Sequence, residues 1–199
     1  LKKIWVPKDF KPSYMVAPFY QCDQLKEVEF EEEITEIPSS LMKSCPGIES
    51  IVIPDTVKII GSEAFSNCEN LKSVTLPASL TEIGYEAFKK CTNLQKVEFP
   101  EGLKTIGTSA FSSCKTLTEV RLPRSLKEAG SYSFEDCMGI TSVWIPKGIT
   151  KAYNTFEYCS NLKTVEFEEG IESIPERLFG DCTGLESIII PETVTQIEK

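Results

Sequence analysis

Apolar residues recur along this chain at a fixed spacing of 22 or 23 residues. The stretch CENLKSVTLPASLTEIGYEAFKKC, from Cys68 to Cys91, shows the unit: apolar residues lie three, six, eight, twelve and fifteen positions after the first cysteine. The same pattern starts at Cys22, Cys45, Cys68, Cys91, Cys114, Cys137, Cys159 and Cys182. A self-similar period of this length is typical of a solenoid, in which each unit is one turn that buries its apolar face only by stacking on its neighbours.

The polar and apolar positions within one unit predict its elements. Residues 71–76 alternate in polarity, which predicts a short strand, and Pro77 ends it because proline has no N–H to donate. A second short extended piece follows at residues 80–83, and residues 86–90 are predicted to form a short helical turn. Two units depart from the pattern, because Glu31 and Glu168 stand where most units have the strand-ending proline.

These elements predict an α/β or mainly β repeat solenoid, a right-handed superhelix of about nine turns of 22–24 residues. We expect parallel strands on one face and short helical turns on the other. The repeat runs through residues 1–199 without a Pro/Gly/Ser-rich break, which indicates a single domain. Both terminal repeats are incomplete, so we expect a fragment or a processed chain of a larger protein. A residue with positive φ is expected two positions after most cysteines, at Gly47, Asn70, Asn93, Gly139, Asn161 and Gly184.

The repeat resembles the BspA-type leucine-rich repeat family, whose motif is present here as L-K-S-V-T-L-P-A-S-L-T-E-I-G-Y-E-A-F-K-K-C. The resemblance covers essentially the whole chain. It implies a leucine-rich repeat solenoid from a bacterial cell-surface or secreted protein that binds other proteins. Some members are associated with adhesion to host matrix or serum proteins or to other cells. The family has no shared catalytic residues, so the resemblance supplies no site.

The composition narrows the function further. A net charge of -9 and a pI near 4.8 disfavour nucleic acids and anionic membrane surfaces as partners. The absence of histidine removes the commonest general base and metal ligand, so we expect no enzyme, no cofactor and no metal. Glutamates cluster at residues 29–33 and 166–169. We interpret them as a solvated face, with a weak calcium site as the alternative.

All eight cysteines occupy one position of the repeat, so they should form a single column. Parallel side chains about 4.8 Å apart do not converge as the two Cβ atoms of a disulfide must. Free, buried thiols are therefore predicted, although a bridge remains the alternative. The phenylalanines form a similar column that we interpret as core packing: Phe65, Phe88, Phe111, Phe134, Phe156 and Phe179.

A binding surface is expected at positions that the packing leaves free. Residues five and seven positions after each cysteine should point outward and stack in two columns, and both tryptophans fall in the second column. Tryptophan and arginine are enriched at interface hot spots. The candidate protein-binding residues are Trp144, Arg121, Glu98, Glu166, Lys96, Glu119 and Trp5. The alternative is purely structural: Arg121 pairs with Glu98 and lies against Trp144, which stabilises the sheet without a ligand.

We therefore expect a non-catalytic protein-binding or adhesion module that is extracellular or at the cell surface. Its partner would be a host matrix or serum protein or another cell-surface protein, with no nucleic acid and no membrane insertion by this segment. One alternative is a structural spacer that holds another domain roughly 40 Å off the cell surface. The other is a carbohydrate-binding module that uses an exposed tryptophan. The sequence predicts no oligomeric state.

Overall fold

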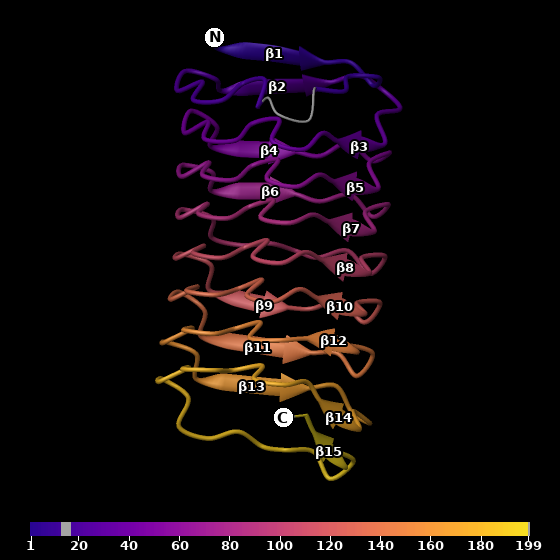
Figure 1. Cartoon of the computed structure of the whole chain (residues 1–199), viewed down its shortest axis with the longest axis vertical. Coiled ribbons are helices and arrows are strands. Elements are labelled where there is room, and N and C mark those ends of the chain that lie inside the picture. The colour runs from indigo at the N-terminus through magenta and orange to yellow at the C-terminus, as the bar shows by residue number, and fades with distance from the viewer. Residues whose placement is uncertain (13–16, 199) are drawn as a thin grey trace.

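The chain is a stack of short parallel β-strands wound into a solenoid of about eight turns (Figure 1). A computed structural model describes residues 1–12 and 17–198, and this part of the chain contains no helix. The predicted repeat solenoid is confirmed. The predicted count of nine turns is wrong, because the first unit contributes only β1 (Lys3–Val6) to the ladders and the last contributes only β15 (Gln196–Ile197).

The first ladder of strands forms the face that carries the predicted site. Equivalent residues of successive turns lie directly opposite one another, as with Ser50 and Ser73 or Ser142 and Thr164. After β1, its strands are β2 (Glu27–Phe30), β4 (Ser50–Val52), β6 (Ser73–Thr75), β9 (Glu119–Arg121), β11 (Ser142–Ile145) and β13 (Thr164–Phe167). They form three separate sheets, β1–β2, β4–β6 and β9–β11–β13, and a bridge from Ser73 to Lys96 extends the second sheet towards the third.

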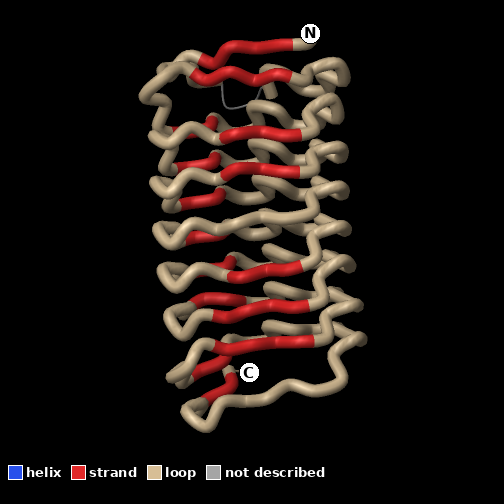
Figure 2. The backbone as a smooth tube through the Cα atoms, turned by 180° about the vertical axis from the view of Figure 1, so that it is seen from behind, coloured by secondary structure: helices blue, strands red, loops and turns tan. Residues whose placement is uncertain are grey.

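A second ladder follows the turn after the first strand, at the second extended piece that the sequence predicted, so strands occupy two faces rather than the single face predicted. Figure 2 shows both ladders from behind, joined by loops. The second ladder is built from two-residue strands: β3 (Glu36–Ile37), β5 (Ile59–Ile60), β7 (Glu82–Ile83), β8 (Thr105–Ile106), β10 (Glu128–Ala129), β12 (Lys151–Ala152), β14 (Ser173–Ile174) and β15.

The back of each unit is a series of tight turns, and the predicted helical turns are wrong. Glu86 has a φ of 51° and Lys90 a φ of 58°, and the equivalent residues of the other units are also left-handed. An α-helix cannot contain such residues. Instead, backbone N–H groups donate to the next turn, as from Phe88 N to the Ala110 oxygen at 2.7 Å. Stacking the units therefore takes the hydrogen bonds that a helix would use internally.

The asparagines and glycines after the cysteines serve the contact between turns, and the predicted positive φ is absent there. Asn70 Nδ2 donates to the Pro46 oxygen of the preceding turn at 2.9 Å. At Gly47 an added Cβ would lie 2.5 Å from the Asp23 oxygen. Most units thus have at this position either a side chain that donates a hydrogen bond to the preceding turn, as Thr116 also does, or glycine.

The eight cysteines are free thiols, as predicted, and Cys45 to Cys182 are buried while Cys22 is half-buried. Each buried thiol donates to a carbonyl oxygen of the preceding turn, for example Cys91 Sγ to the Phe65 oxygen at 3.2 Å. Burial raises the pKa of the Cys68 thiol to about 12 and that of Cys91 well above its usual value. The column therefore satisfies buried backbone oxygens as well as filling space.

The phenylalanine column is confirmed as core packing. Successive rings stack with centroids 5.0 Å apart at Phe65 and Phe88 and 5.2 Å apart at Phe111 and Phe134. Phe156 and Phe179 continue the stack at 5.8 Å. The rings belong to the same hydrophobic core as the thiols and form a continuous stack of aromatic rings through it.

An irregularity of the core spans two successive units, the one that ends at Cys137 and the 22-residue unit that follows it. The buried alanine position of earlier units, as at Ala110, is taken by Ser133 and then by Thr155, which lie opposite each other in successive turns. Both side chains are fully buried, and neither hydroxyl has a hydrogen-bond partner among the described residues. These two buried hydroxyls are therefore exceptions to the rule that buried polar groups are hydrogen-bonded.

Candidate protein-binding surface around Trp144

The pairing of β9, β11 and β13 sets the site. Trp144 lies directly between Arg121 and Glu166 on the outward face of the first ladder. Alternation within each strand produces this exposure, because Val143 and Ile145 of β11 point into the core and are buried. The predicted register of these three residues is confirmed.

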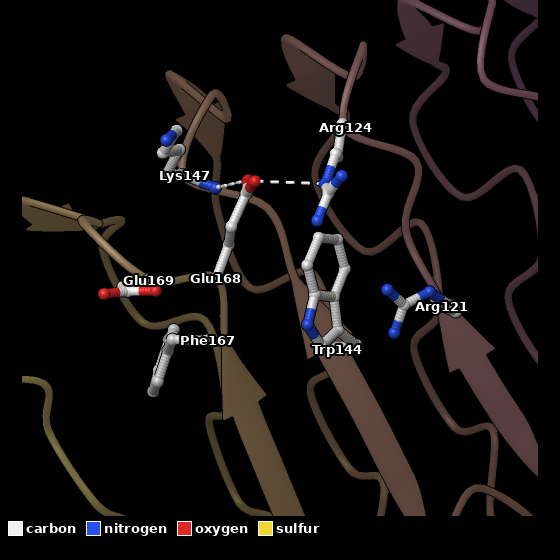
Figure 3. Close-up of a pocket in the computed structure, with 7 residues that line it drawn as sticks. All are labelled: Arg121, Arg124, Trp144, Lys147, Phe167, Glu168 and Glu169. Carbon is white, nitrogen blue, oxygen red and sulfur yellow. Dashed lines mark hydrogen bonds and ion pairs between the residues drawn. The ribbon is translucent and has the colours of Figure 1, made fainter.

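Arg121 covers the indole of Trp144. The guanidinium carbon lies 4.1 Å from the ring centroid, and that of Arg124 lies 6.0 Å from it (Figure 3). Because the guanidinium covers its ring, Trp144 is half-buried rather than fully exposed, even though it points outward. Within residues 1–12 and 17–198, the Arg121 side chain forms no hydrogen bond and no ion pair. Its N–H donors are therefore held in place by the ring and free to bind an external acceptor.

An open hollow of about 440 Å³ lies beside the ring. Glu168 closes one side of it, because its carboxylate forms an ion pair with Arg124 Nε at 3.1 Å and accepts a hydrogen bond from the Lys147 backbone N–H at 3.1 Å (Figure 3). The hollow is lined by Arg121, Arg124, Trp144, Lys147, Phe167, Glu168 and Glu169.

Five of these lining residues are absent from the predicted set: Arg124, Lys147, Phe167, Glu168 and Glu169. One sequence signal pointed to them, namely the glutamate that replaces the strand-ending proline at Glu168. A carboxylate at that position reaches the backbone N–H of Lys147 in the preceding turn, which a proline ring cannot do. The replacement of proline by Glu168 therefore marks the turn at which the hollow forms.

None of the remaining predicted residues lines the hollow. Lys96 pairs with Glu98 at 2.7 Å, and this hydrogen bond lowers the pKa of Glu98 and raises that of Lys96. In the structural alternative, the pair between Glu98 and Arg121 is therefore wrong, whereas the contact of Arg121 with Trp144 is confirmed. Glu119 lies opposite Ser142 in the ladder, two residues before Arg121.

Trp5 is not part of this surface. It lies on β1 at the opposite end of the stack (Figure 1) and is 57% exposed. A second open hollow of about 500 Å³ lies beside it. That hollow is lined by Trp5, Lys8, Phe30, Glu31, Glu32 and Glu33.

The glutamate clusters do not converge on a point. Within the described residues, no group of three or more carboxylates and thiols has the arrangement that could hold a metal ion. Several glutamates are instead paired with cations across turns, as Glu33 is with Lys8 at 2.8 Å. The same part of the chain has no helix that is long and apolar enough to span a membrane.

Comparison with known proteins identifies the repeat. The model of the BspA type leucine rich repeat region matches residues 15–102 and 81–199, with six copies. No curated protein matches the sequence at a significant level.

Solved structures share the fold. The T. pallidum leucine-rich repeat protein TpLRR is 29% identical, with a TM-score of 0.73 over 94% of this chain and 84% of its own. A leucine-rich repeat protein from Eubacterium ventriosum is 22% identical with a TM-score of 0.73, and the pneumococcal vaccine antigen PcpA is 21% identical with a TM-score of 0.62. This chain, covered to 98% and 100%, spans 56% and 63% of the lengths of those two proteins. The chain belongs to the BspA-type leucine-rich repeat family.

Proposed function

We propose that this chain is a non-catalytic protein-binding module of a cell-surface or secreted protein, and that it binds through the outward face around Trp144. The observation that carries the proposal is the guanidinium of Arg121, which lies 4.1 Å from the Trp144 ring centroid and has no acceptor among the described residues. A large aromatic side chain beside a pre-positioned arginine is the composition of interface hot spots.

The charges around the hollow favour a polypeptide partner. Three cationic side chains and two carboxylates line it, so the hollow is of mixed charge with a formal excess of one positive charge: Arg121, Arg124, Lys147, Glu168 and Glu169. A partner that presents both acidic and apolar side chains would satisfy Arg121 and cover the indole. A polyanion is disfavoured, because the nearby carboxylates of Glu119 and Glu166 would repel it.

The proposed location draws on similar folds. One protein of the same fold is described as a leucine rich cell surface protein from Faecalibacterium prausnitzii, with 23% identity and a TM-score of 0.51. PcpA is described as a vaccine antigen. These descriptions support a surface or secreted location for this chain, where a protein-binding face would meet matrix, serum or cell-surface proteins.

Two variants of the chain test the proposal. The first combines Arg121→Ala with Trp144→Ala, and the matched control combines Ser73→Ala with Thr75→Ala on the same face of β6. Both are passed over immobilised matrix, serum and cell-surface proteins in surface plasmon resonance. We expect the wild-type chain and the control to bind one of these proteins equally. The double variant should bind it at least about 30-fold more weakly, which corresponds to a loss of about 2 kcal/mol.

Equal binding by the double variant and the wild type would remove the Trp144 surface as the site. A wild-type chain that binds none of the proteins would favour the spacer. Binding to a glycan array that depends on Trp144 would favour the carbohydrate-binding alternative, although Arg121 already covers one face of that ring.

A further inference from the structure

Three positions of each unit lie at the surface where the chain passes from the first ladder to the second: seven, ten and thirteen residues after the cysteine. The unit at Cys159 has a glutamate at all three. The units at Cys114 and Cys137 instead hold four cations and no carboxylate there, whereas in the other units that start at a cysteine these positions are together neutral or acidic. We call these four residues the basic corner: Arg121, Arg124, Lys127 and Lys147.

Most of the charge of the basic corner is not neutralised within the chain. All four residues are exposed, and within residues 1–12 and 17–198 only Arg124 has an ion-pair partner, Glu168. Lys127 Nζ lies 3.0 Å from the point where a Cβ on Gly148 would stand. The glycine therefore leaves room for this ammonium, one residue away from Lys147. Three of the four cations are thus free to bind an external acceptor.

The basic corner is a local exception in an acidic chain. Residues 103–151 contain seven lysines and arginines and four carboxylates, a formal charge of +3, whereas the whole chain carries -9. The equivalent positions of the flanking units are acidic, with Glu98 and Glu101 before the basic corner and Glu166, Glu169 and Glu172 after it. An anionic ligand is therefore attracted to two turns and repelled by the turns on either side.

The width of the basic corner restricts the class of ligand. Adjacent turns are about 4.8 Å apart, so a chain of regularly repeated anionic groups that crosses several turns would meet the flanking carboxylates. A polypeptide can confine its charges to two or three residues and place an apolar side chain beside them. Trp144 and the half-buried Phe167 offer an apolar surface for that side chain next to Arg121 and Lys147 (Figure 3).

We propose that the basic corner binds a short acidic segment of the partner protein, with two or three aspartates or glutamates next to an apolar residue that packs against Trp144. The inference deepens the proposed function and rests on it, because it names the chemistry of the partner that binds the outward face around Trp144. It also extends the site beyond the hollow, since Lys127 does not line that hollow. Complementary charge of this kind gives speed and selectivity to association.

The probe is the peptide N-acetyl-Asp-Asp-Phe-Asp amide, and its uncharged control has asparagine in place of each aspartate. The indole N–H signal of Trp144 in a ¹H–¹⁵N spectrum reports binding, and Trp144→Phe assigns it, because the chain has two tryptophans. We expect the acidic peptide to shift this signal with a dissociation constant of about 1 mM or below, and the control to bind at least about tenfold more weakly. Raising NaCl from about 50 to about 300 mM should weaken the acidic peptide, because salt screens exposed charges.

The variant Lys127→Ala with Lys147→Ala should weaken binding of the acidic peptide about fivefold or more. Lys26→Ala with Lys58→Ala is the matched control, because it removes two exposed lysines from turns outside the basic corner and should leave binding intact. Equal binding of the asparagine peptide, an unchanged affinity in the first variant, or no saturable shift at about 20 mM would overturn the proposal. Tighter binding of a heparin hexasaccharide would overturn it in favour of an anionic polysaccharide.

The failure of this inference can be told apart from the failure of the proposed function. A protein captured through Arg121 and Trp144 that binds the variant of Lys127 and Lys147 as tightly as the wild type would remove the acidic segment and leave the proposed function standing. An acidic peptide that binds at the basic corner, with no protein captured by the wild-type chain, would remove the proposed function alone.

Discussion

Arg121 and Trp144 lie directly opposite each other on β9 and β11, with the guanidinium carbon 4.1 Å from the ring centroid. We expect a double-mutant cycle with Arg121→Ala and Trp144→Ala to give a coupling free energy of about 0.5–1 kcal/mol, because the contact is a partly exposed cation–π pair. Urea unfolding of the four chains measures it. A coupling free energy near zero would show that the two side chains are adjacent without stabilising the sheet.

The thiol column predicts a loss of stability at alkaline pH. Burial raises the pKa of Cys45 and Cys182 to about 11 and that of Cys68 to about 12, whereas an unfolded thiol titrates near about 8.5. Unfolding above that pH therefore releases protons, so stability is complete below about 8.5 and falls towards the folded pKa values. In this window each buried thiol lowers the free energy of unfolding by up to about 1.4 kcal/mol for each pH unit of increase.

The free energy of unfolding, measured between pH 7 and pH 10, tests this slope. Cys114→Ala removes one such thiol, so its slope above about pH 8.5 should be shallower by about one proton. A stability that stays constant to about pH 10 would contradict the burial of the column. Below about pH 8 the free energies of unfolding of the wild type and the variant should change with pH in the same way.

The unpaired buried hydroxyls of Ser133 and Thr155, in two successive units, predict stabilising substitutions. Ser133→Ala and Thr155→Val should each raise the free energy of unfolding by about 1 kcal/mol, because each removes a buried hydroxyl without a partner. Ser112→Ala is the control, since the buried Ser112 hydroxyl is hydrogen-bonded to Glu135 at 3.1 Å and its loss should destabilise. Chemical denaturation distinguishes the two signs.

The phenylalanine stack predicts a position-dependent cost. Phe111→Ala should destabilise the chain by about 3–5 kcal/mol, because the ring is fully buried and stacked on Phe88 and Phe134 at 5.1 and 5.2 Å. Phe179 stacks only on Phe156 within the described residues and is half-buried, so Phe179→Ala should cost clearly less. Equal losses at both positions would contradict a cooperative stack.

The repeat made the register predictable. Because each unit occupies one turn, a position counted from the cysteine specifies its neighbours above and below, which placed Arg121 opposite Trp144 and the thiols in one interior column. The same count could not predict the back of the solenoid. The left-handed positions hold residues as different as Glu86, Tyr132 and Arg177, so the hydrogen bonds between turns select that conformation rather than residue type.

The hollow itself was only partly predictable, for a related reason. Arg124 and Glu168 are 44 residues apart and belong to turns that are not neighbours, yet their side chains meet at 3.1 Å. A column of equivalent positions describes neighbouring turns, and it contains no information about long side chains that cross an intervening turn. The ion pair between Arg124 and Glu168 depends instead on the length and rotamers of the two side chains and on their opposite charges.

The segments WVPK (residues 5–8) and EFEE (residues 29–32) recur as WIPK (144–147) and EFEE (166–169), so the same outward residues occupy two consecutive turns at two places in the stack while the interior columns stay unchanged. Each turn contacts only its neighbours, so the exposed residues of one pair of turns can change without redesign of the core. The outer surface of this solenoid can therefore diversify turn by turn while its interior is held constant.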